Sequence, residues 1–407
     1  MKILVVNTGS SSIKYRLFDM KNLTLMASGL IEKIGAAESI VSHKTYKPDG
    51  SIESLKERQP VANHKVGLEL IAKLFIDEKY GCIKDYSEIT AVGHRIVHGG
   101  EKLLEPVFVT PEIIKEVEKL VPLAPLHNSA HLMGIDVAQY VFPDAKHVLV
   151  MDTSFHHTIP KHAYMYAIPY EFYEKNLVRK YGFHGTSHKY VSHTLANHVG
   201  KKVEDINIIS IHLGNGSSVT AVHKGKSIDT SMGLTPLAGL LMGTRCGDID
   251  PAIFHYIAKA RNIDVTAVDE ILNKKSGVLG ICGCSDMREV EDKMAEGDER
   301  AVLASDMLAY QIVKYIGSYF AVLGGLDYIL FTAGVGENSG DIRERVMKQL
   351  GGFGITLNNE VNWANEGRLG EITKISGEDS KIDVFVVPTN EELQIAKDTE
   401  NLILNNN

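Results

Sequence analysis

The sequence has few cysteines, and their spacing does not suggest a structural metal site. Four cysteines among 407 residues are too few for a disulfide scaffold and predict reduced thiols in a cytoplasmic protein. Cys282 and Cys284 flank one glycine, but no second pair of ligands stands at zinc-site spacing from them. His184 and His188, four residues apart, also lack further candidate ligands. We therefore expect no zinc site.

Long apolar runs and clusters of basic residues are also missing. No apolar stretch approaches the roughly 20 residues that span a membrane, and the sequence starts with an apolar strand candidate rather than a signal peptide. The formal net charge is −8. Nucleic acids and membranes are therefore not expected as partners, and any anionic substrate must be bound by local cations.

Two common nucleotide-binding signatures are missing as well. No P-loop motif (Gly-x4-Gly-Lys followed by Ser or Thr) is present, which excludes a P-loop fold. The segment 334–339 (GVGENS) has glycines that let a backbone lie against a flat or phosphorylated ligand. It has serine, however, where the dinucleotide fingerprint requires a third glycine.

The first stretch of the chain, residues 3–19, predicts a β-hairpin. An apolar strand (ILVV) is followed by a turn of small polar residues (NTGSSS) and by a return strand that alternates apolar and polar residues. Such a turn can direct backbone N–H groups and hydroxyls at an anion, with Lys14 as a nearby charge. On this stretch alone, an ordinary hairpin with a polar tip is the simpler interpretation.

The same pattern recurs in the second half, at residues 206–226 (INIISIHLGNGSSVTAVHKGK). Two such hairpins, each opening one half of the chain, predict a duplicated fold with a phosphate-binding hairpin in each half. A length of 407 residues with 44% hydrophobic content supports two cores, with a boundary near residue 150. This plan resembles that of actin-like, sugar-kinase-like and Hsp70-like ATPases, which bind ATP in the cleft between two similar domains.

Apolar strands precede three charged residues, at the positions where ligands gather in α/β sheets. Strands at residues 89–92, 148–151 and 384–387 lead to Arg95, Asp152 and Glu391, respectively. Arg95 is placed to bind an anion, and Asp152 to orient a metal-bound water or a catalytic cation. Glu391 opens the last helix, where an acidic residue that only complements the helix dipole is a strong alternative.

The intervening segments predict helices and loops. Residues 64–75 form a helix with Val66, Leu70 and Leu74 toward the core, whereas the polar stretch 35–60 indicates an irregular surface excursion.

Three loops carry further candidates. A proline-stiffened loop carries His127, although a histidine in such a loop is more often structural than catalytic. Thr186 or Ser187 caps the next helix, which places His184 at a helix N-terminus that favours a phosphate. Arg245 stands between glycines, as Arg95 does.

Nine segments, in order along nearly the whole chain, together give a specific resemblance. They are VVNTGSSSIKY, GHRIVHGGE, LAPLHN, DTSFHHTIP, RKYGFHGTSHKYV, IHLGNGSSVTAV, GTRCGDIDPAI, FTAGVGENS and PTNEEL. On these motifs the sequence resembles the acetate kinase (acetokinase) family of the actin-like ATPase superfamily.

The resemblance implies an α/β protein with a duplicated actin-like ATPase (ribonuclease H-like) fold and an active site in the cleft between two domains. It implies an N-terminal domain, residues 1–150, on which the C-terminal helix 389–407 packs. Residues 151–388 would form a C-terminal domain with most nucleotide-binding loops and the interface of a homodimer. The implied reaction is reversible, direct transfer of a phosphoryl group from ATP to acetate, giving ADP and acetyl phosphate, with Mg²⁺ or Mn²⁺.

The resemblance also implies roles for individual residues. Asp152, His184 and Arg245 match the catalytic set, Arg95 and His127 the acetate site, and Asn7 and Glu391 the Mg²⁺ site. The pocket for the methyl group would consist of Val97, Leu126, Phe183 and Pro236. The nucleotide would contact Lys14, His212, Leu213, Gly214, Asn215, Gly216, Asp286, Met287, Arg288, Gly334, Val335, Gly336, Glu337 and Asn338.

The chemistry of this transfer agrees with these residue types. A carboxylate acceptor, with a pKa of about 4.3, is ionised at neutral pH and needs no general base. Its difficulty is the approach of an anion to a polyanion, which cations and neutral donors could relieve: Arg95, Arg245, His184 and His127. Two alternatives remain. The acceptor could be propionate or butyrate, since one methylene is worth only about 1–3 kcal/mol, or the chain could be an actin-like ATP switch without an acid site.

Overall fold

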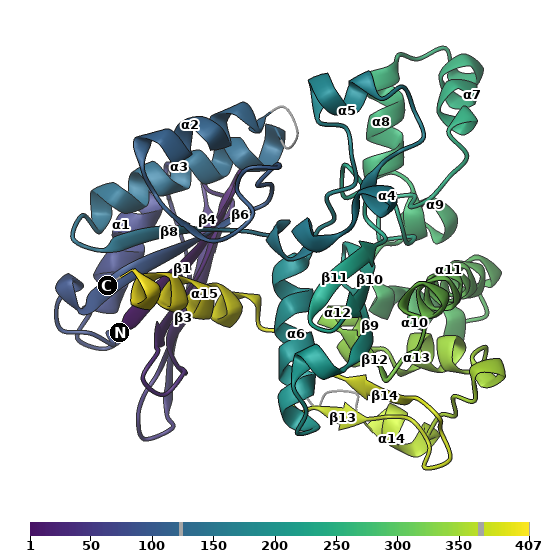
Figure 1. Ribbon diagram of the computed structural model, residues 1–407. Helices are drawn as coiled ribbons and strands as arrows, with labels where there is room; N and C mark the ends of the chain where they lie inside the picture. The colour runs from purple at the N-terminus through teal and green to yellow at the C-terminus, as the bar shows by residue number, and fades with distance from the viewer. Residues whose placement is uncertain (122–124, 365–369, 407) are drawn as a thin grey trace. The chain divides into compact units, whose positions relative to one another are not determined.

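A computed structural model describes residues 1–121, 125–364 and 370–406, and for residues 125–127 it describes the backbone alone. The chain separates into two compact units (Figure 1). Unit 1 comprises Met1–Ser154 and Asn390–Asn407, and unit 2 comprises Phe155–Thr389. Unit 1 therefore extends past residue 150, the boundary expected from the sequence, and each unit is described by itself.

Unit 1 is built on one mixed sheet. Its strands are β1 (Lys2–Gly9), β2 (Ser12–Asp19), β3 (Thr24–Glu32), β4 (Ser39–Tyr46), β5 (Ile52–Gln59), β6 (Ile89–Ile96), β7 (Val107–Phe108) and β8 (Lys146–Met151). Its helices are α1 (His64–Phe75), α2 (Pro111–Lys119), α3 (Pro125–Val141) and α15 (Glu391–Asn405), with a 3₁₀ turn η1 (Tyr86–Glu88). The strand order is β5-β4-β3-β2-β1-β6-β8-β7, in which β1, β6 and β8 are parallel and the remaining neighbours are antiparallel.

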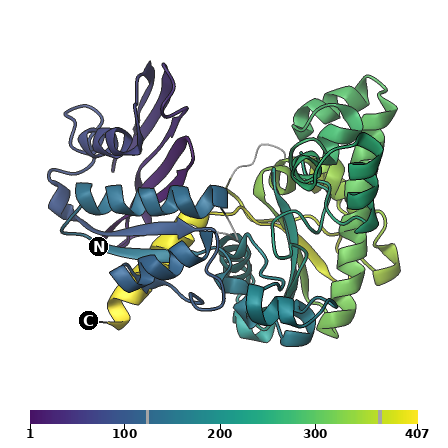
Figure 2. The ribbon, with the colours of Figure 1, turned by 90° about the horizontal axis from the view of Figure 1, so that it is seen from above.

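Both faces of the unit 1 sheet are covered, which explains why β1 is apolar at consecutive positions. Leu4 and Val6 belong to the core cluster that includes residues of α1 and α3. Ile3 and Val5 lie on the opposite face, in a cluster with Ile395 of α15. The helix α15 (yellow in Figures 1 and 2) therefore completes a core that the first strand begins. Full burial of one such side chain is worth about 1.5–3 kcal/mol.

Unit 2 is built on a second mixed sheet. Its strands are β9 (Asn207–Leu213), β10 (Ser217–His223), β11 (Lys226–Thr230), β12 (Tyr328–Thr332), β13 (Thr373–Lys374) and β14 (Asp383–Val386). Its helices are α4 (Lys161–Tyr164), α5 (Glu171–Asn176), α6 (Gly185–His198), α7 (Ala252–Arg261), α8 (Val265–Lys274), α9 (Gly277–Cys282), α10 (Met287–Ala295), α11 (Glu299–Leu323), α12 (Ala333–Asn338), α13 (Gly340–Met347) and α14 (Asn359–Ala364). Three 3₁₀ turns are η3 (Ser154–Thr158), which begins at the last residue of the first segment of unit 1, η4 (Val203–Asp205) and η5 (Gly351–Phe353).

The unit 2 sheet also has a helix layer on each face. The apolar side of α6 packs against Ile208 and Leu330, and α11 covers Ile209, Ile211 and Phe331 on the opposite face. Although α11 is the longest helix, no helix in the described part of the chain is both long and apolar enough to cross a membrane.

The two sheets repeat one topology. The order β11-β10-β9-β12-β14-β13 corresponds strand by strand to β3-β2-β1-β6-β8-β7. In each sheet an antiparallel hairpin is followed by two parallel strands and an antiparallel edge strand. This confirms the predicted α/β class, duplicated in the manner of the actin-like ATPases, and unit 1 adds β4 and β5.

Both predicted hairpins are present, with tips of different length. In β1–β2, Gly9 pairs with Ser12, which leaves a two-residue tip. In β9–β10, Leu213 pairs with Ser217, and the three residues 214–216 form the tip.

Two predictions for the first 75 residues were wrong. The stretch 35–60 contains β4 and β5 rather than an irregular excursion, because β5 is an edge strand that can keep polar side chains on both faces. The helix α1 has the predicted bounds, and Leu74 is buried as predicted, but Val66 is 39% exposed, whereas Leu68 and Ile71, which were not predicted, are fully buried.

Two predictions about helix starts were also wrong. The segment with His127 is not a loop, because α3 begins at Pro125, a residue suited to the first helical position. At α6 neither Thr186 nor Ser187 is the cap, because His184 occupies that position with a left-handed backbone (φ 56°).

Candidate functional site

In unit 1, the ends of β6 and β8 bring Arg95 and Asp152 together. Arg95 Nη2 donates to Asp152 Oδ2 at 3.1 Å, and Arg95 Nε lies 3.9 Å from Glu391 Oε2 of α15. The Asp152 side chain is buried and that of Arg95 is 18% exposed. Burial disfavours the arginine charge, but Asp152 and the two glutamates of α15 outweigh it and raise the pKa of Arg95. Arg95 therefore stays a cation.

The first turn of α15 is held by two further cations of unit 1. Lys14 Nζ lies 2.5 Å and Arg16 Nη1 3.6 Å from the Glu392 carboxylate. Arg16 also donates to Oδ1 of Asn390, the cap of α15, at 2.9 Å. Although burial acts to raise it, the pKa of Glu392 is lowered by Lys14 and Arg16. These contacts fix the position of Glu391.

Glu391 is in the opposite electrostatic situation. Burial, together with the carboxylates of Asp152 and Glu392, raises its pKa, and Arg95 and Lys14 offset this only in part. The nearby cations therefore do not fully compensate the burial and negative surroundings of the Glu391 carboxylate.

Asn7 lies on the same face of the unit 1 sheet. Side chains alternate along β1, so Asn7 follows Ile3 and Val5 on the face covered by α15. Lys14 is its direct partner on β2. The structure therefore gathers five predicted site residues of unit 1 on one sheet face: Asn7, Lys14, Arg95, Asp152 and Glu391.

In unit 2, His184 and Arg245 meet at the tip of the β9–β10 hairpin. A Cβ placed on Gly216 would lie 3.2 Å from both His184 Nε2 and Arg245 Nη1, so only glycine leaves them unhindered. His184 stacks on His212 with ring centroids 4.1 Å apart, and its Nδ1 lies 2.8 Å from Ser218 Oγ.

Arg245 differs from Arg95 in its partners. Its Nη1 donates to the Pro236 carbonyl at 3.1 Å and lies 3.8 Å from the Met242 sulfur. Among the described residues it forms no ion pair, and burial lowers its pKa. Its charge is thus not neutralised by a neighbouring carboxylate.

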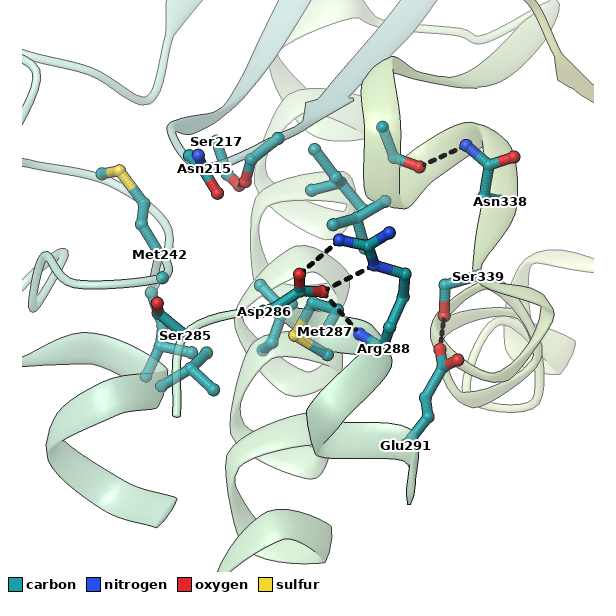
Figure 3. Close-up of a pocket in the computed structure, with 18 residues that line it drawn as sticks. Asn215, Ser217, Met242, Ser285, Asp286, Met287, Arg288, Glu291, Asn338 and Ser339 are labelled. Carbon is teal, nitrogen blue, oxygen red and sulfur yellow. Dashed lines mark hydrogen bonds and ion pairs between the residues drawn. The ribbon is translucent and has the colours of Figure 1, made fainter. Parts of the chain in front are cut away.

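A cavity of about 780 Å³ opens beside this hairpin, entirely within unit 2 (Figure 3). Nine of the residues predicted to contact a nucleotide line it: Leu213, Gly214, Asn215, Asp286, Met287, Arg288, Gly334, Val335 and Asn338. Figure 3 shows Arg288 paired with Asp286 through two hydrogen bonds of 3.0 and 2.5 Å, and Asn338 donating to the Gly334 carbonyl at 2.8 Å. The volume lies within the roughly 300–1,000 Å³ of small-molecule sites.

The other predicted nucleotide residues lie outside the lining of this cavity. Lys14 belongs to unit 1, His212 and Gly216 contact His184, and the Gly336 carbonyl accepts from Arg343 at 2.9 Å. Glu337 Oε1 accepts from the backbone N–H groups of Ala333 and Thr389, at 2.9 and 3.0 Å. Although these bonds oppose it, burial raises the pKa of Glu337.

Half of the cavity lining was not predicted from the sequence. It consists of Ser217, Leu241, Met242, Gly243, Val278, Ser285, Glu291, Leu308 and Ser339. Ser285 directly precedes the predicted nucleotide residues 286–288, and Ser339 is the last residue of the segment 334–339, so both had a usable signal. Leu308 belongs to the apolar stripe of α11 and carries no local mark of a binding site.

The residues predicted for a methyl pocket are divided between the units. Val97 is buried in unit 1, and Phe183 and Pro236 belong to unit 2. The side chains of Leu126 and His127 lie outside the described residues. The convergence of this set stays a prediction.

Comparisons with known proteins agree on one family. The family model described as the acetokinase family matches residues 2–397. The chain is 50% identical over 405 residues to an acetate kinase of Halothermothrix orenii, covering 99% of this chain and all of that protein. It is 50% identical over 408 residues to an acetate kinase of Clostridium novyi, covering both chains in full.

Solved structures give the same result. An acetate kinase of Porphyromonas gingivalis superposes with a TM-score of 0.92 at 45% identity, covering 99% of each chain. A propionate kinase of Francisella tularensis superposes with a TM-score of 0.90 at 40% identity, covering 98% of this chain and 99% of that one. The chain belongs to the acetokinase family.

Proposed function

We propose that this protein is an ATP-dependent acetate kinase that reversibly transfers the γ-phosphoryl group of ATP to acetate, giving ADP and acetyl phosphate. One observation carries the reaction class: relatives named acetate kinase match the chain from end to end at about half identity. The propionate kinase neighbour is less similar and supports the same class of acceptor, a short carboxylate.

The two units supply different groups to the proposed reaction. The cavity of unit 2 would hold the nucleotide, with its flat base against the apolar wall that includes Leu241, Val278 and Leu308. His184 and Arg245, at the hairpin tip beside this cavity, would stabilise the transferring phosphoryl group, because donors and cations lower the barrier of phosphoryl transfer.

Unit 1 would hold the acceptor. Arg95 presents a planar guanidinium that binds carboxylates in a two-pronged geometry, and Asp152 fixes its orientation through one hydrogen bond. Acetate is ionised at neutral pH, so Asp152 orients Arg95 and abstracts no proton. The proposed transfer is direct, from the ATP oxygen to the acetate oxygen, without a phosphorylated side chain.

Mg²⁺ fits the donor set on the unit 1 sheet face. Glu391 is a carboxylate short of positive charge and Asn7 offers an amide oxygen, both ligand types that Mg²⁺ accepts. Mg²⁺ usually takes only one or two protein ligands and keeps waters and substrate phosphates as the others. We infer that these residues would hold Mg²⁺ or Mn²⁺, which would neutralise phosphate charge.

A homodimer is part of the proposal. Large apolar side chains are exposed on α7 and α11, among them Tyr256, Tyr310, Leu303 and Val322. Such surfaces support a self-complementary interface. The dimer is tested by light scattering, which measures the molecular mass of the unsubstituted protein and of Tyr310→Glu in solution. The mass of the variant should lie closer to that of the monomer.

The activity is tested by measuring ADP release with and without acetate, while hydroxylamine traps acyl phosphate. Acetate-dependent ADP release with stoichiometric hydroxamate supports the proposal. If ADP release is the same with and without acetate, and no hydroxamate forms, the protein is an ATP switch instead. The same assay with propionate and butyrate ranks the acceptors.

The metal site is tested by a Mg²⁺ titration of Glu391→Gln. A site residue predicts a sharply raised Mg²⁺ requirement. A residue that only serves the helix dipole predicts an unchanged titration and at most about 1 kcal/mol lost from the free energy of unfolding.

A further inference from the structure

A chain of four hydrogen-bonded side chains runs from His184, which is partly buried, into the interior of unit 2. His184 Nδ1 lies 2.8 Å from Ser218 Oγ, which lies 2.8 Å from His188 Nε2. His188 Nδ1 in turn lies 2.8 Å from Ser210 Oγ. Ser218, His188 and Ser210 are fully buried between α6 and the β9–β10 strands.

Counting hydrogens along this chain decides which ring nitrogen of His184 carries the proton. Ser218 has one hydroxyl hydrogen but contacts two histidine nitrogens, so it donates to one and accepts from the other. Ser210 has only His188 as a side-chain partner in the described part of the chain. Its buried hydroxyl therefore donates to His188 Nδ1, since a buried donor without an acceptor is costly.

The remaining assignments then follow in one direction. With Nδ1 accepting, neutral His188 carries its proton on Nε2 and donates it to Ser218. Ser218 has its own hydrogen left and donates it to His184 Nδ1. Neutral His184 thus carries its proton on Nε2, the nitrogen that faces Gly216 and Arg245.

The surroundings of His188 keep it neutral, as this assignment requires. Burial, and then the neighbouring rings of His156 and His212, lower the pKa of His188 well below its usual range. The Arg245 guanidinium near His184 also disfavours a second positive charge there.

We propose that Ser218, His188 and Ser210 form a relay that positions His184 as an Nε2–H donor to the transferring phosphoryl group. The three are positioning residues, since they act through His184. This inference rests on the proposed role of His184 and adds how the protein selects one tautomer of a ring that would otherwise populate both. Without the relay, a lone pair rather than an N–H would face the phosphate in part of the molecules.

The direct test is nitrogen NMR of histidine-labelled protein, with His184 assigned by comparison with His184→Gln. We expect the Nε2–H tautomer in the unsubstituted protein and a mixture in Ser218→Ala. Ser218→Thr, which keeps the hydroxyl, should restore the Nε2–H tautomer. An Nδ1–H tautomer in the unsubstituted protein, or an unchanged tautomer in Ser218→Ala, would overturn the relay.

Kinetics provide the second readout. Ser218→Ala should lower kcat by about 10–100-fold, less than loss of a transition-state donor itself, with little change in the KM for ATP. Ser210→Ala removes only the far end of the relay and should act in the same direction more weakly. It also serves as the test if Ser218→Ala does not fold.

Ser192→Ala is the matched control. Ser192 is a fully buried serine of the same helix, α6, whose hydroxyl has no partner among the described residues. It should leave both the tautomer and kcat unchanged. If His184→Gln proves fully active, the proposed role of His184 fails, while the tautomer measurement still decides whether the relay exists.

Discussion

The two units share one strand order but use opposite electrostatics at their proposed sites. In unit 1, the cation Arg95 is neutralised by Asp152 and approached by Glu391. In unit 2, Arg245 has only neutral partners among the described residues, a carbonyl and a thioether. The duplication thus preserved the backbone, while side chains at the strand ends and hairpin tips diverged. An arginine that is paired with a carboxylate is held in one orientation. An arginine without such a partner has a charge that is available to a bound anion.

Substituting the two arginines separates these roles most strongly. Arg245→Ala should lower kcat by about 10³-fold or more, in the range of arginines that stabilise phosphoryl transfer, without changing the melting temperature. Arg95→Ala should raise the KM for acetate and also lower the free energy of unfolding by about 3 kcal/mol, because it removes an ion-pair partner of the buried Asp152 carboxylate.

Lysine is the matched replacement at both positions. It keeps the charge but lacks the planar fork, so it should rescue poorly. Steady-state kinetics and thermal unfolding of the four variants provide the measurement, and near-normal turnover of both lysine variants would contradict a two-pronged role.

Acceptors of different size test whether the acyl site lies in unit 1. Val97 is buried directly after β6, two residues beyond Arg95. If it lines the methyl pocket, Val97→Ala should shift the ratio of kcat/KM values toward propionate and butyrate by roughly 10–200-fold. The KM for ATP serves as the internal control and should not change. An unchanged acetate-to-propionate ratio would remove Val97 from the acyl site.

The hairpin tip of unit 2 offers a backbone test. Gly216→Ala should lower kcat by about 10–100-fold, since the added methyl group displaces His184 and Arg245, and small misplacements are costly in catalysis. Gly317→Ala is the control, because a Cβ there meets nothing closer than 4.0 Å, and this residue lies within α11. Equal kcat values for the two variants would show that the tip has room to adjust.

Each unit also buries a neutral histidine, which makes stability depend on pH. Burial, and then His147 and His131, lower the pKa of His94 well below its usual range. Below about pH 6.5 the unfolded chain therefore binds a proton at this histidine that the folded chain does not bind. As the pH decreases, this group lowers the free energy of unfolding by about 1.4 kcal/mol per pH unit. Urea unfolding between about pH 7.5 and 5 should show a flatter dependence in His94→Gln. An unchanged slope would mean that His94 is protonated in the folded protein.

Local patterns predicted the skeleton of the fold and of the site. Apolar runs followed by small residues located both hairpins, and strand ends located Arg95 and Asp152, because strands covered on both faces are apolar at consecutive positions. The edge strand β5 left no such mark, since polar side chains can occupy both of its faces. Proline before His127 suggested a loop, although proline also starts helices.

Contacts between distant segments could not be predicted from local patterns. The pairing of Lys14 and Arg16 with Glu392 joins the second strand to the last helix, and the sequence around these residues gives no sign of it. The apolar wall of the cavity likewise combines Leu241, Val278 and Leu308 from separate elements. The relay behind His184 could be recognised only from side-chain positions, because a sequence gives the serines and histidines but not which of them form hydrogen bonds with one another.

The position of α15 has a consequence for synthesis on the ribosome. Ile3 and Val5 are among the first residues made, yet their covering partner Ile395 is among the last. Residues 155–389 of unit 2 are complete before then, so unit 2 can finish its core while unit 1 still exposes one face of its sheet. The nascent chain thus carries an unfinished apolar surface until translation ends. A ribosome that stops before codon 391 would release a protein lacking both that cover and Glu391, a natural substrate for chaperones and proteases.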